Sequence, residues 1–399
     1  MLINNYLKII FSHINRVKVA RKKLKNVNKK THDKNQKWKI GFIVQMPEIW
    51  DKIEDVYNEL CRRSNTEVYL VVVPSFNLKN NSLNPYGYEL DFFTKISNNI
   101  ILAIDDMNQT TDIQKFNFDY VFYQRPYDSY LPEKLQSDYV ANFLRICYIP
   151  YADFQGEDFT LSSPFFYNVS YGFMYSEEAC IRLKRKSSCR FLNKYQSFYY
   201  TYPIFERYQN MKTTSNRINK KIVWTPRWTT DITIGGSHFF DYKDKILDLN
   251  KKFENVDIVF RPHPLAFENY VAKGLMTEED VKTYLKKLQQ NNILLDTNLK
   301  VEDTFKDADI LISDISSVIT MFYLTDKPII YCNTNRKLND TYKKIIQSLY
   351  IANSWEDIER YLSELINGND YMLKKRKETK VKLFSNKKNT AAFIVDKLI

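Results

Sequence analysis

The chain has 399 residues, 44% of them hydrophobic and only eight of them glycine, so it can form two domains with ordinary cores and is not collagen-like or of low complexity. Its formal net charge of +12 is concentrated near the N-terminus, where residues 1–36 hold ten Lys or Arg and one acid, Asp33. The rest of the chain carries only about +3, which argues against a nucleic-acid-binding surface on the folded part.

Cysteine usage indicates a reducing compartment, and hydropathy gives no sign of a membrane span. The five cysteines are odd in number and widely spaced, and only four histidines occur, so we expect no disulfide framework, no metal site and no cofactor. Cys147 and Cys332 lie in apolar strand-like runs and are predicted to be core thiols. No apolar run approaches the roughly 18 residues of a membrane span, and no signal peptide is recognisable, so we expect a cytoplasmic protein.

Residues 1–36 are predicted to form a basic amphipathic arm. Apolar residues recur at helical spacing, at Leu2, Ile3, Tyr6, Leu7, Ile10, Ile14 and Val17. A basic run from Arg21 to Lys30 follows. Such a helix can lie on an anionic membrane surface, or it can pack on its own domain and lead into a charged linker. Both interpretations stay open here, and the local concentration of charge favours the membrane surface.

Continuously apolar strands alternate with helices after the arm. Strands are expected at 38–45, 67–73, 99–105, 118–128 and 144–153, with a helix around 49–63. This alternation is typical of a parallel sheet that is covered on both faces. We therefore expect a first Rossmann-like domain over residues 37–210.

The same pattern restarts near residue 220. Strands are expected at the start of "KKIVWTPRW" and at 256–260, 291–296, 308–317 and 327–333, with a helix over 277–290. The stretch 172–215 is interpreted mostly as helix and connection. The fold class is therefore α/β, with a second doubly wound Rossmann-type domain over residues 211–399.

Charged and hydroxyl residues of the second half follow its predicted strands. In open parallel sheets, ligands bind beyond the carboxyl ends of the strands. The residues at these ends are Arg227 after the first strand, Arg261 and His263 after the second, and Ser313, Asp314, Ser316 and Ser317 after the fourth. A helix start with free N–H groups and hydroxyls, next to an arginine and a histidine, favours a metal-independent diphosphate site. Taken singly, the acid and serines would suit a plain helix cap and His263 an ordinary turn.

The motifs "FRPHP" and "ISDISSVITMFYLTDKPIIYC" resemble the second half of the CDP-glycerol glycerophosphotransferase family, which makes teichoic acids and capsule polymers. "IVWTPRW" resembles the start of that family's second domain. The resemblance is specific over about 221–333. It implies a GT-B-like fold, in which two Rossmann domains face across a cleft. Residues 37–210 would be the acceptor domain and 211–399 the nucleotide-donor domain.

Roles of individual residues follow from this resemblance. Arg261 and His263 would contact the donor diphosphate, and His263 would stabilise the departing CMP. Ser316 and Ser317 would hold phosphate oxygens, and Asp314 would cap their helix or meet the ribose. Arg227 and Ser313 complete the expected donor-binding set.

The first domain departs from the family pattern at the position where the family carries the residue expected to be the catalytic base. The family usually carries a His-Gly-Thr-Pro stretch there, whereas this chain has "CYIPYADFQGEDF" and no histidine between His32 and His238. Asp153 is the expected replacement, with Glu157 and Asp158 behind it. A carboxylate can deprotonate an acceptor hydroxyl within hydrogen-bond reach.

Three further residues are assigned to catalysis or to the acceptor. His238, in the glycine-containing loop "IGGSHFF", is a second candidate for the catalytic base. Tyr151 would orient the acceptor. Arg125, in "YQRPYDSYLP", is placed on the acceptor side, although a packed corner would explain that stretch as well.

The resemblance implies a transferase that moves a glycerophosphate, or a related phosphoalditol, from a CDP-linked donor and releases CMP. The acceptor would be a hydroxyl of a polymeric cell-surface glycan or its lipid-linked precursor. The enzyme would sit peripherally on the inner face of the cell membrane. Two alternatives remain, a GT-B glycosyltransferase that uses a CMP- or UDP-sugar, and a non-catalytic scaffold that binds a nucleotide or glycan.

Overall fold

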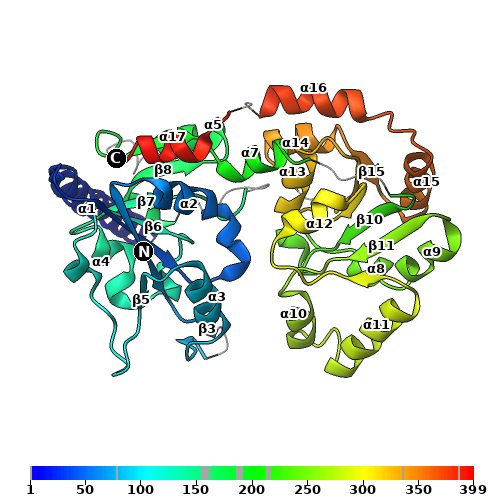
Figure 1. Ribbon diagram of the computed structural model, residues 1–399, viewed down its shortest axis with the longest axis horizontal. Coiled ribbons are helices and arrows are strands. Elements are labelled where there is room, and N and C mark those ends of the chain that lie inside the picture. Colours follow the sequence, from blue (N-terminus) through cyan, green and yellow to red (C-terminus); the bar gives the residue numbers. More distant parts are fainter. Residues whose placement is uncertain are drawn as a thin grey trace. The chain divides into compact units, whose positions relative to one another are not determined.

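The computed structural model describes residues 2–77, 80–153, 161, 163–185, 192–212, 217–334, 337–384 and 387–399, with the side chains of 2–12 and 234 excepted. The chain forms two compact units. The first comprises residues 1–152, 158–206 and 387–399, and the second comprises 153–157 and 207–386. Within each unit the strands form a central layer with helices on either side (Figure 1).

The first unit is built on a seven-stranded parallel sheet in the order β5-β2-β1-β6-β7-β8-β9. Its strands are β1 Trp38–Val44, β2 Thr66–Val72, β5 Ile100–Leu102, β6 Tyr120–Tyr123, β7 Arg145–Tyr148, β8 Val169–Met174 and β9 Ser197–Tyr200. Its helices are α1 Leu2–Asn28, α2 Glu54–Arg62, α3 Tyr88–Ile96, α4 Ser137–Val140, α5 Glu177–Arg185 and α17 Thr390–Asp396. A two-stranded antiparallel hairpin, β3 Phe76–Asn77 and β4 Ser82–Leu83, lies outside the sheet.

Alternate residues of these strands supply the two faces of the sheet. Ile43, Val121 and Ile146 belong to one buried cluster, which the aromatic residues of the segment 164–167 complete. On the other face, Phe42 stacks on Phe122 and packs edge-on against Tyr57 of α2. The continuously apolar strands thus reflect burial on both faces.

The N-terminal helix α1 packs on the first unit along its second half. Val17, Ala20, Leu24 and Val27 are buried, and the first three cluster with Tyr167 and Leu192. The spacing of these residues places them on one helical face. The structure therefore supports the interpretation in which the arm packs on its own domain, as far as residues 17–27 are concerned. No helix in the described part of the chain is both long and apolar enough to cross a membrane.

The second unit has a six-stranded parallel sheet in the order β12-β11-β10-β13-β14-β15. Its strands are β10 Lys220–Thr225, β11 Val256–Phe260, β12 Leu294–Leu295, β13 Ile310–Ser313, β14 Ile329–Cys332 and β15 Tyr350–Ala352. Its helices are α8 Phe239–Tyr242, α9 Leu249–Lys252, α10 Ala266–Ala272, α11 Glu278–Gln290, α12 Val301–Asp307, α13 Ser317–Tyr323, α14 Asp340–Ile346, α15 Trp355–Ile366 and α16 Leu373–Leu383. Helix α7, Pro203–Gln209, spans the boundary between the two units.

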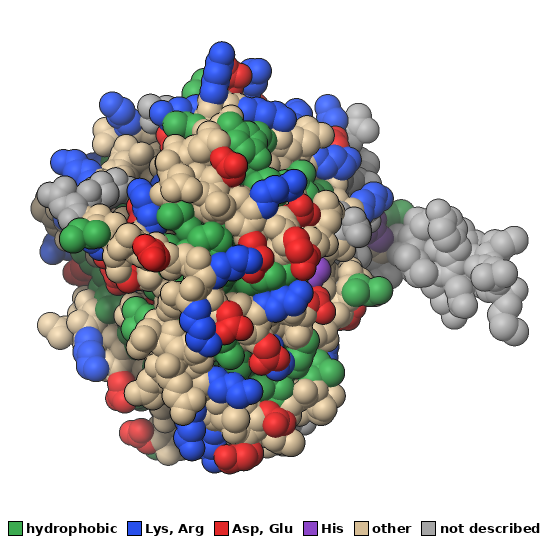
Figure 2. Space-filling model, turned by 90° about the vertical axis from the view of Figure 1, so that its right-hand side faces the viewer, with side chains coloured by type: hydrophobic (Ala, Val, Ile, Leu, Met, Phe, Trp, Pro, Cys, Tyr) green, Lys and Arg blue, Asp and Glu red, His purple; other side chains and the backbone are tan. Residues whose placement is uncertain are grey.

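One face of this second sheet carries a large aromatic core. Trp224 of β10 and Phe260 of β11 pack with Phe239 of α8, and the cluster continues into helices α10, α11 and α15. Cys332 of β14 is part of the cluster, and Cys147 of the first sheet is also fully buried. The prediction that these two are core thiols is confirmed. On the face of the molecule shown in Figure 2, basic and acidic side chains are interspersed.

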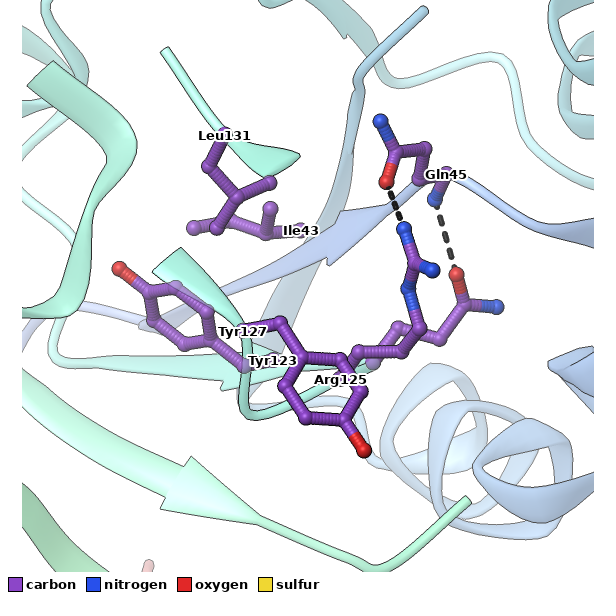
Figure 3. A pocket seen from close by; sticks show the side chains of 7 residues that line it. Ile43, Gln45, Tyr123, Arg125, Tyr127 and Leu131 are labelled. Atoms are coloured by element: carbon purple, nitrogen blue, oxygen red, sulfur yellow. Dashed lines mark hydrogen bonds between the residues drawn. The ribbon is translucent and has the colours of Figure 1, made fainter. Parts of the chain in front are cut away.

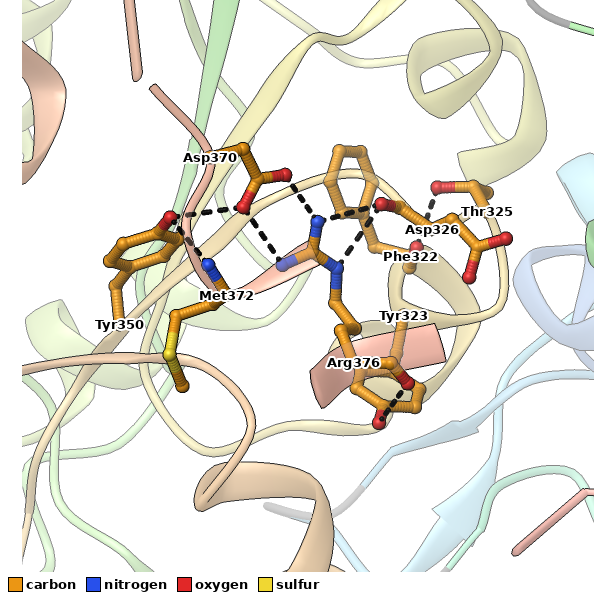
Figure 4. Close-up of polar contacts among 8 residues, drawn as sticks. All are labelled: Phe322, Tyr323, Thr325, Asp326, Tyr350, Asp370, Met372 and Arg376. Carbon is orange, nitrogen blue, oxygen red and sulfur yellow. Dashed lines mark hydrogen bonds and ion pairs between the residues drawn. The ribbon is translucent and has the colours of Figure 1, made fainter. Parts of the chain in front are cut away.

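A buried ion pair fixes α16 to the second unit (Figure 4). Arg376 is fully buried, and its guanidinium pairs with Asp370 at 2.5 Å. The same guanidinium donates to the carbonyl of Asp326 at 2.8 and 3.1 Å, and Tyr350 donates to Asp370 at 2.9 Å. A buried guanidinium needs such a full set of acceptors, so this cluster is structural.

The structure corrects the sequence interpretation in two stretches. Residues 172–215, expected to be mostly helix and connection, include β9 and the second half of β8. Strand β15 lies beyond the last strand expected. These strands are short and rich in tyrosine, so their apolar runs are too brief to give a periodic signal. The C-terminal residues 387–399 also group with the first unit, where Asp396 of α17 pairs with Arg63 next to α2.

Candidate functional site

The candidate site lies at the switch point of the second sheet. Strand order reverses between β10 and β13, so the chain leaves these two neighbours toward opposite sides. In such sheets the crevice beyond the carboxyl ends of the two strands is where ligands bind. Arg227 follows β10, and Asp314, Ser316 and Ser317 follow β13. The predicted residues of both strand ends therefore meet at one edge.

Asp314 holds the loops of this edge together. Its Oδ2 accepts the backbone N–H groups of Arg227 at 2.8 Å and His238 at 3.2 Å, and the hydroxyl of Ser237 at 3.2 Å. Burial raises the pKa of this carboxyl, while the hydrogen bonds it accepts oppose the rise. Asp314 is almost wholly buried and does not cap helix α13, because the N-cap position is Ser316. The expected capping role is thus wrong.

Arg261 is tied to the protein by several bonds. Its guanidinium donates to Asp296 at 2.7 Å, to the hydroxyl of Thr304 at 3.2 Å and to the carbonyl of Asn298 at 2.7 Å. Burial on its own would raise the pKa of Asp296, but hydrogen bonds from Thr304 and Asn298, with the charge of Arg261, lower it. Arg261 therefore stands as a fixed positive charge at the end of β11, with part of its hydrogen-bonding capacity already used.

His263 presents an imidazole with a defined tautomer. The backbone N–H of Leu265 donates to Nδ1 at 3.1 Å, so the proton of the neutral ring lies on Nε2. One side of the residue is exposed, and the rest is partly desolvated beside Trp228. Desolvation, with the charges of Arg227 and Arg261, lowers the pKa of His263 to about 4. At neutral pH the ring is uncharged and carries its one N–H donor on Nε2.

The three serines of this edge differ in their surroundings. Ser313 is fully buried, and its Oγ accepts from Thr225 at 2.8 Å and donates to the carbonyl of Asp314 at 2.8 Å. It belongs to the sheet interior, so the expectation that it binds the donor is wrong. Ser316 and Ser317 are half-buried at the start of α13. The Oγ of Ser316 is buried without a hydrogen-bond partner in the part of the chain that the structure describes.

His238 is held by hydrogen bonds at both ring nitrogens. Nδ1 faces Asp241 at 2.9 Å and Nε2 faces the carbonyl of Asn333 at 3.1 Å. Burial alone would lower the pKa of this imidazole, but Asp314, Asp241 and the carbonyl raise it. Gly235, at φ +124°, lies so close to Ile315 that a Cβ there would come within 2.8 Å of its side chain. The loop is packed, and in this geometry neither nitrogen is available to take a proton from an acceptor.

Asp153 groups with the second unit, although the sequence places it just after the last expected strand of the first domain. Its carboxylate is buried and accepts a hydrogen bond from the hydroxyl of Thr320 in α13. The hydroxyl of Thr320 also lies 3.0 Å from the hydroxyl of Tyr342, which donates to the carbonyl of Ser316. Glu157 and Asp158, expected behind Asp153, lie outside the described residues.

Arg125 and Tyr151 belong to the switch point of the first sheet, between β1 and β6. A small pocket there is lined by Gln45 after β1 and by Arg125 and Tyr127 after β6 (Figure 3). Arg125 donates to the side-chain oxygen of Gln45. The hydroxyls of Tyr127 and Tyr151 are 2.9 Å apart. Both predicted acceptor-side residues are thus at one edge of one sheet.

Some residues of these two edges were not expected from the sequence. They are Asp296 and Thr304 around Arg261, Ser237 on Asp314, and Gln45 with Gln124 in the first sheet. Asp296 ends the predicted strand 291–296, so the rule of strand ends could have found it. Ser237 and the glutamines carry no comparable signal, because a single hydroxyl or amide in a loop is common.

The comparisons with known proteins identify a family for the second half of the chain. Residues 202–393 match the family described as CDP-Glycerol:Poly(glycerophosphate) glycerophosphotransferase. The chain matches none of the curated proteins with which it was compared.

Several solved structures share the fold. The wall teichoic acid polymerase TagF is 14% identical, with 99% of this chain and 97% of TagF covered and a TM-score of 0.56. UDP-GlcNAc 2-epimerase from Neisseria meningitidis is 13% identical, with 90% and 99% covered and a TM-score of 0.58. The S. aureus MnaA–UDP structure is 14% identical, with 90% and 95% covered and a TM-score of 0.56. At these identities the likeness concerns the fold alone.

The two parallel sheets and these neighbours define a GT-B-like α/β protein, which confirms the predicted fold class. Within that class, residues 202–393 match the CDP-glycerol glycerophosphotransferase family, and this match indicates a transferase of that type. The resemblance inferred from "FRPHP" and "ISDISS" is thereby confirmed.

Proposed function

We propose that the protein transfers a glycerophosphate, or a related phosphoalditol, from a CDP-linked donor to a hydroxyl of a cell-surface glycan or its lipid-linked precursor. The observation that carries the proposal is the position of the family's motifs. Within the matched residues 202–393, Arg227, His263 and Ser316 come from three different segments and gather at one switch point. A TagF variant is described as soaked with CDPG, which is consistent with a CDP-linked donor.

The proposed reaction is attack of the acceptor oxygen on the phosphorus next to the alditol. The new P–O bond forms as the bond to CMP breaks, and CMP leaves with the negative charge. Arg227 and Arg261 supply fixed positive charge, and the Nε2–H of His263 donates to the departing phosphate. Arg261 acts chiefly through its charge, because Asp296 already occupies one edge of its guanidinium. With two arginines present, we propose that the step needs no metal ion.

The acceptor proton would pass to Asp153. Thr320, its hydrogen-bond donor, lies three residues after Ser317 on α13, so the carboxylate lies near the helix face on which Ser317 begins. Tyr151 would orient the acceptor. His238 is not included, because both of its nitrogens face internal acceptors.

Calorimetry with a nucleotide panel tests this proposal. The panel contains CDP-glycerol, CDP-ribitol, CMP, UDP, UDP-sugars and CMP-sialic acid, with the wild type, His263→Ala and, as a matched control, His13→Ala. We expect the CDP-alditols to bind, His263→Ala to lose about tenfold or more in affinity, and His13→Ala to keep it. Release of CMP with an acceptor present would complete the case.

The other outcomes favour the two alternatives or overturn the proposal. Binding of a sugar nucleotide alone would indicate a GT-B glycosyltransferase. Binding of CDP-glycerol without CMP release would indicate a scaffold. If no nucleotide binds, the cluster of Arg227, Arg261 and His263 is only a structural corner.

We further propose that the enzyme works at the inner face of the cell membrane, held there by the basic side of α1. Lys18, Lys22, Lys25 and Lys29 are exposed, while the apolar side from Val17 to Val27 is already buried. Adsorption through this part of the helix would therefore be electrostatic. Co-sedimentation with phosphatidylglycerol vesicles should fall steeply with added salt, and neutral vesicles should not bind.

A further inference from the structure

Within the described part of the chain, the guanidinium of Arg125 forms no ion pair with a carboxylate. Among the residues that the structure describes, it makes one hydrogen bond, to the side-chain oxygen of Gln45, and lies 4.9 Å above the ring of Tyr130. Desolvation lowers the pKa of Arg125 and the charge of Glu48 raises it slightly, but the two residues form no ion pair. Glu48 instead accepts a hydrogen bond from Tyr88. Buried and half-buried guanidiniums are ordinarily paired.

The surroundings of Arg125 are rigid. Gln124 joins the two strand ends of the switch point, because its Oε1 accepts the backbone N–H groups of Gln45 at 2.9 Å and Met46 at 2.8 Å. Its Nε2 returns a bond to the carbonyl of Met46 at 2.6 Å. Gln45 is fastened in turn to the carbonyl of Pro74 at 2.7 Å. Because Gln45 and Gln124 are fixed by these hydrogen bonds, the guanidinium that bonds to Gln45 is held in place before any ligand binds.

Aromatic rings with hydroxyl groups surround the guanidinium. Tyr127 packs edge-on against Tyr130 at 5.8 Å and against Tyr151 at 6.1 Å. Tyrosine offers an apolar face and a hydrogen-bonding tip, a combination suited to a ligand with carbon-bound hydroxyls. Figure 3 shows Arg125 and Tyr127 around the small pocket between the ends of β1 and β6. The positive charge and the rings together fit an anionic ester of a polyol.

We propose that this pocket binds a phosphate group of the acceptor, with Arg125 on the phosphate and the tyrosines on the attached polyol. The inference rests on the proposed function, in which a growing polymer carries such groups. It adds that the acceptor is recognised through a phosphate at the first sheet, separately from the donor phosphates at the second. The pocket would select acceptors that already carry a phosphoalditol or a phosphate-linked lipid.

The desolvation of the Arg125 guanidinium is consistent with a site that binds an anion. Desolvation lowers the pKa of its guanidinium, and the nearby tyrosines and Glu48 oppose this only in part. A cation in this state disfavours the folded protein until an anion arrives. Replacing it should therefore leave the stability of the free protein unchanged or improved, which a purely structural arginine would not allow.

The test uses the full chain with two probes, sn-glycerol 3-phosphate and glycerol. The variants are Arg125→Gln, Arg125→Lys and, as a matched control, Arg62→Gln, whose arginine is exposed and pairs with Glu59 on the helix surface. We expect saturable binding of glycerol 3-phosphate but not of glycerol. Affinity should fall about tenfold to a hundredfold in Arg125→Gln, fall less in Arg125→Lys and stay unchanged in Arg62→Gln. The melting temperature of ligand-free Arg125→Gln should equal or exceed that of the wild type.

Two more measurements separate this inference from the proposed function. The second sheet has arginines of its own, so the relevant binding is the part that is lost in Arg125→Gln and kept in His263→Ala. CDP-glycerol binding should show the reverse. If CDP-glycerol fails to bind while the Arg125-dependent binding remains, the proposed function fails and the pocket stands. If glycerol 3-phosphate binding is the same in Arg125→Gln, or glycerol binds equally well, the inference is overturned.

A diester probe, diglycerol phosphate, distinguishes a phosphate within a polymer chain from a terminal phosphate. Binding of the diester at least as tight as that of the monoester would indicate recognition along a polymer chain. Preference for the monoester would indicate a terminal phosphate. A lower melting temperature in Arg125→Gln without loss of glycerol 3-phosphate binding would make Arg125 a structural residue and overturn the inference.

Discussion

The two sheets both place arginines just after their strands, but the surroundings of these arginines differ. In the second sheet, Arg261 is paired with a buried carboxylate, Asp296, and Arg227 donates to the carbonyl of Ile315 at 2.5 Å. In the first sheet, Arg125 makes no ion pair within the described residues, bonds to Gln45 and lies over the ring of Tyr130. Arg125 and Arg227 each follow a strand at which the strand order reverses, and Arg261 follows β11, the neighbour of β10.

We infer from this difference that the arginines of the second sheet stabilise the shape of their site, whereas Arg125 is available to bind an anionic ligand. A paired and hydrogen-bonded guanidinium can define the shape of a site before any ligand arrives. A desolvated guanidinium that forms no ion pair is only partly compensated by a hydrogen bond and an aromatic contact, which favours the proposal that it binds an anionic ligand. Substitutions can test the distinction, because the two kinds of residue should respond in opposite ways.

The largest effect is expected where the pairing is most deeply buried. Asp370→Asn removes the partner of Arg376, whose side chain is fully buried. The variant should lose about 3–5 kcal/mol in the free energy of unfolding, because a buried charge is left without its counterion. Urea denaturation measures this loss. The control Asp357→Asn disrupts a more exposed pair with Arg360 and should cost less than about 1 kcal/mol. Equal losses in the two variants would contradict the role assigned to burial.

Arg261→Gln should give an intermediate loss. Asp296 would keep its hydrogen bonds from Thr304 and the backbone of Asn298, so we expect about 1–3 kcal/mol in the free energy of unfolding. The pKa of Asp296 should rise in the variant, because the lowering influence of the guanidinium is gone. The same denaturation experiment on Arg125→Gln should show no loss. If both variants are equally destabilised, Arg125 is as structural as Arg261 and the comparison fails.

The sequence predicted which residues lie at the strand ends of this site better than it predicted which side chains pair with one another. Strand-end residues such as Arg227, His263 and Ser316 were found because apolar strands are easy to recognise and parallel strands end at one edge. Ser313 was misassigned, because the last residue of a strand points to either face and no pattern of four residues fixes which. The pairing of Arg261 with Asp296 depends on the tertiary packing of two loops that are 35 residues apart.

In the first domain, too, contacts that depend on tertiary packing could not be predicted from the sequence. The absence of the family histidine was visible in the sequence, but the position of Asp153 with the second unit was not, since no local signal marks where a loop crosses between units. Arg125 was found at a strand end, yet whether it was paired could not be known. Pairing is decided by residues such as Gln45 and Glu48, far from it in the chain.

Two serines of the second sheet offer a smaller contrast. Ser313→Ala should cost about 1 kcal/mol in the free energy of unfolding, because Thr225 loses its buried acceptor, and should leave CDP-glycerol affinity unchanged. Ser316→Ala should leave stability unchanged, because its hydroxyl has no partner in the described part of the chain. If that hydroxyl donates to a donor phosphate, affinity should fall about tenfold. Denaturation and calorimetry on the two variants provide the check, and the reverse pattern would exchange their roles.

Two histidines affect stability only as the pH changes, and the signs of their effects differ. His238 has a raised pKa, so its contribution is fully present below the unfolded pKa of about 6.5 and is lost as pH rises through the folded pKa. His263 has a pKa lowered to about 4, so the unfolded chain binds more protons between about 4 and 6.5. Its neutral form therefore favours the folded state above that window, and this stability is lost as pH falls through it.

Histidine NMR titration separates the two residues and connects them to the site. We expect His238 to titrate above 6.5 and His263 near 4, with resonances assigned from His238→Gln and His263→Ala. A bound CDP-linked donor would place negative charge beside Arg227 and Arg261, whose positive charges contribute to the low pKa of His263. That pKa should therefore rise on addition of CDP-glycerol, while the pKa of His238, whose nitrogens face Asp241 and Asn333, should move little. If the pKa of His263 does not change on saturation with donor, the donor phosphates do not lie between these arginines and the imidazole.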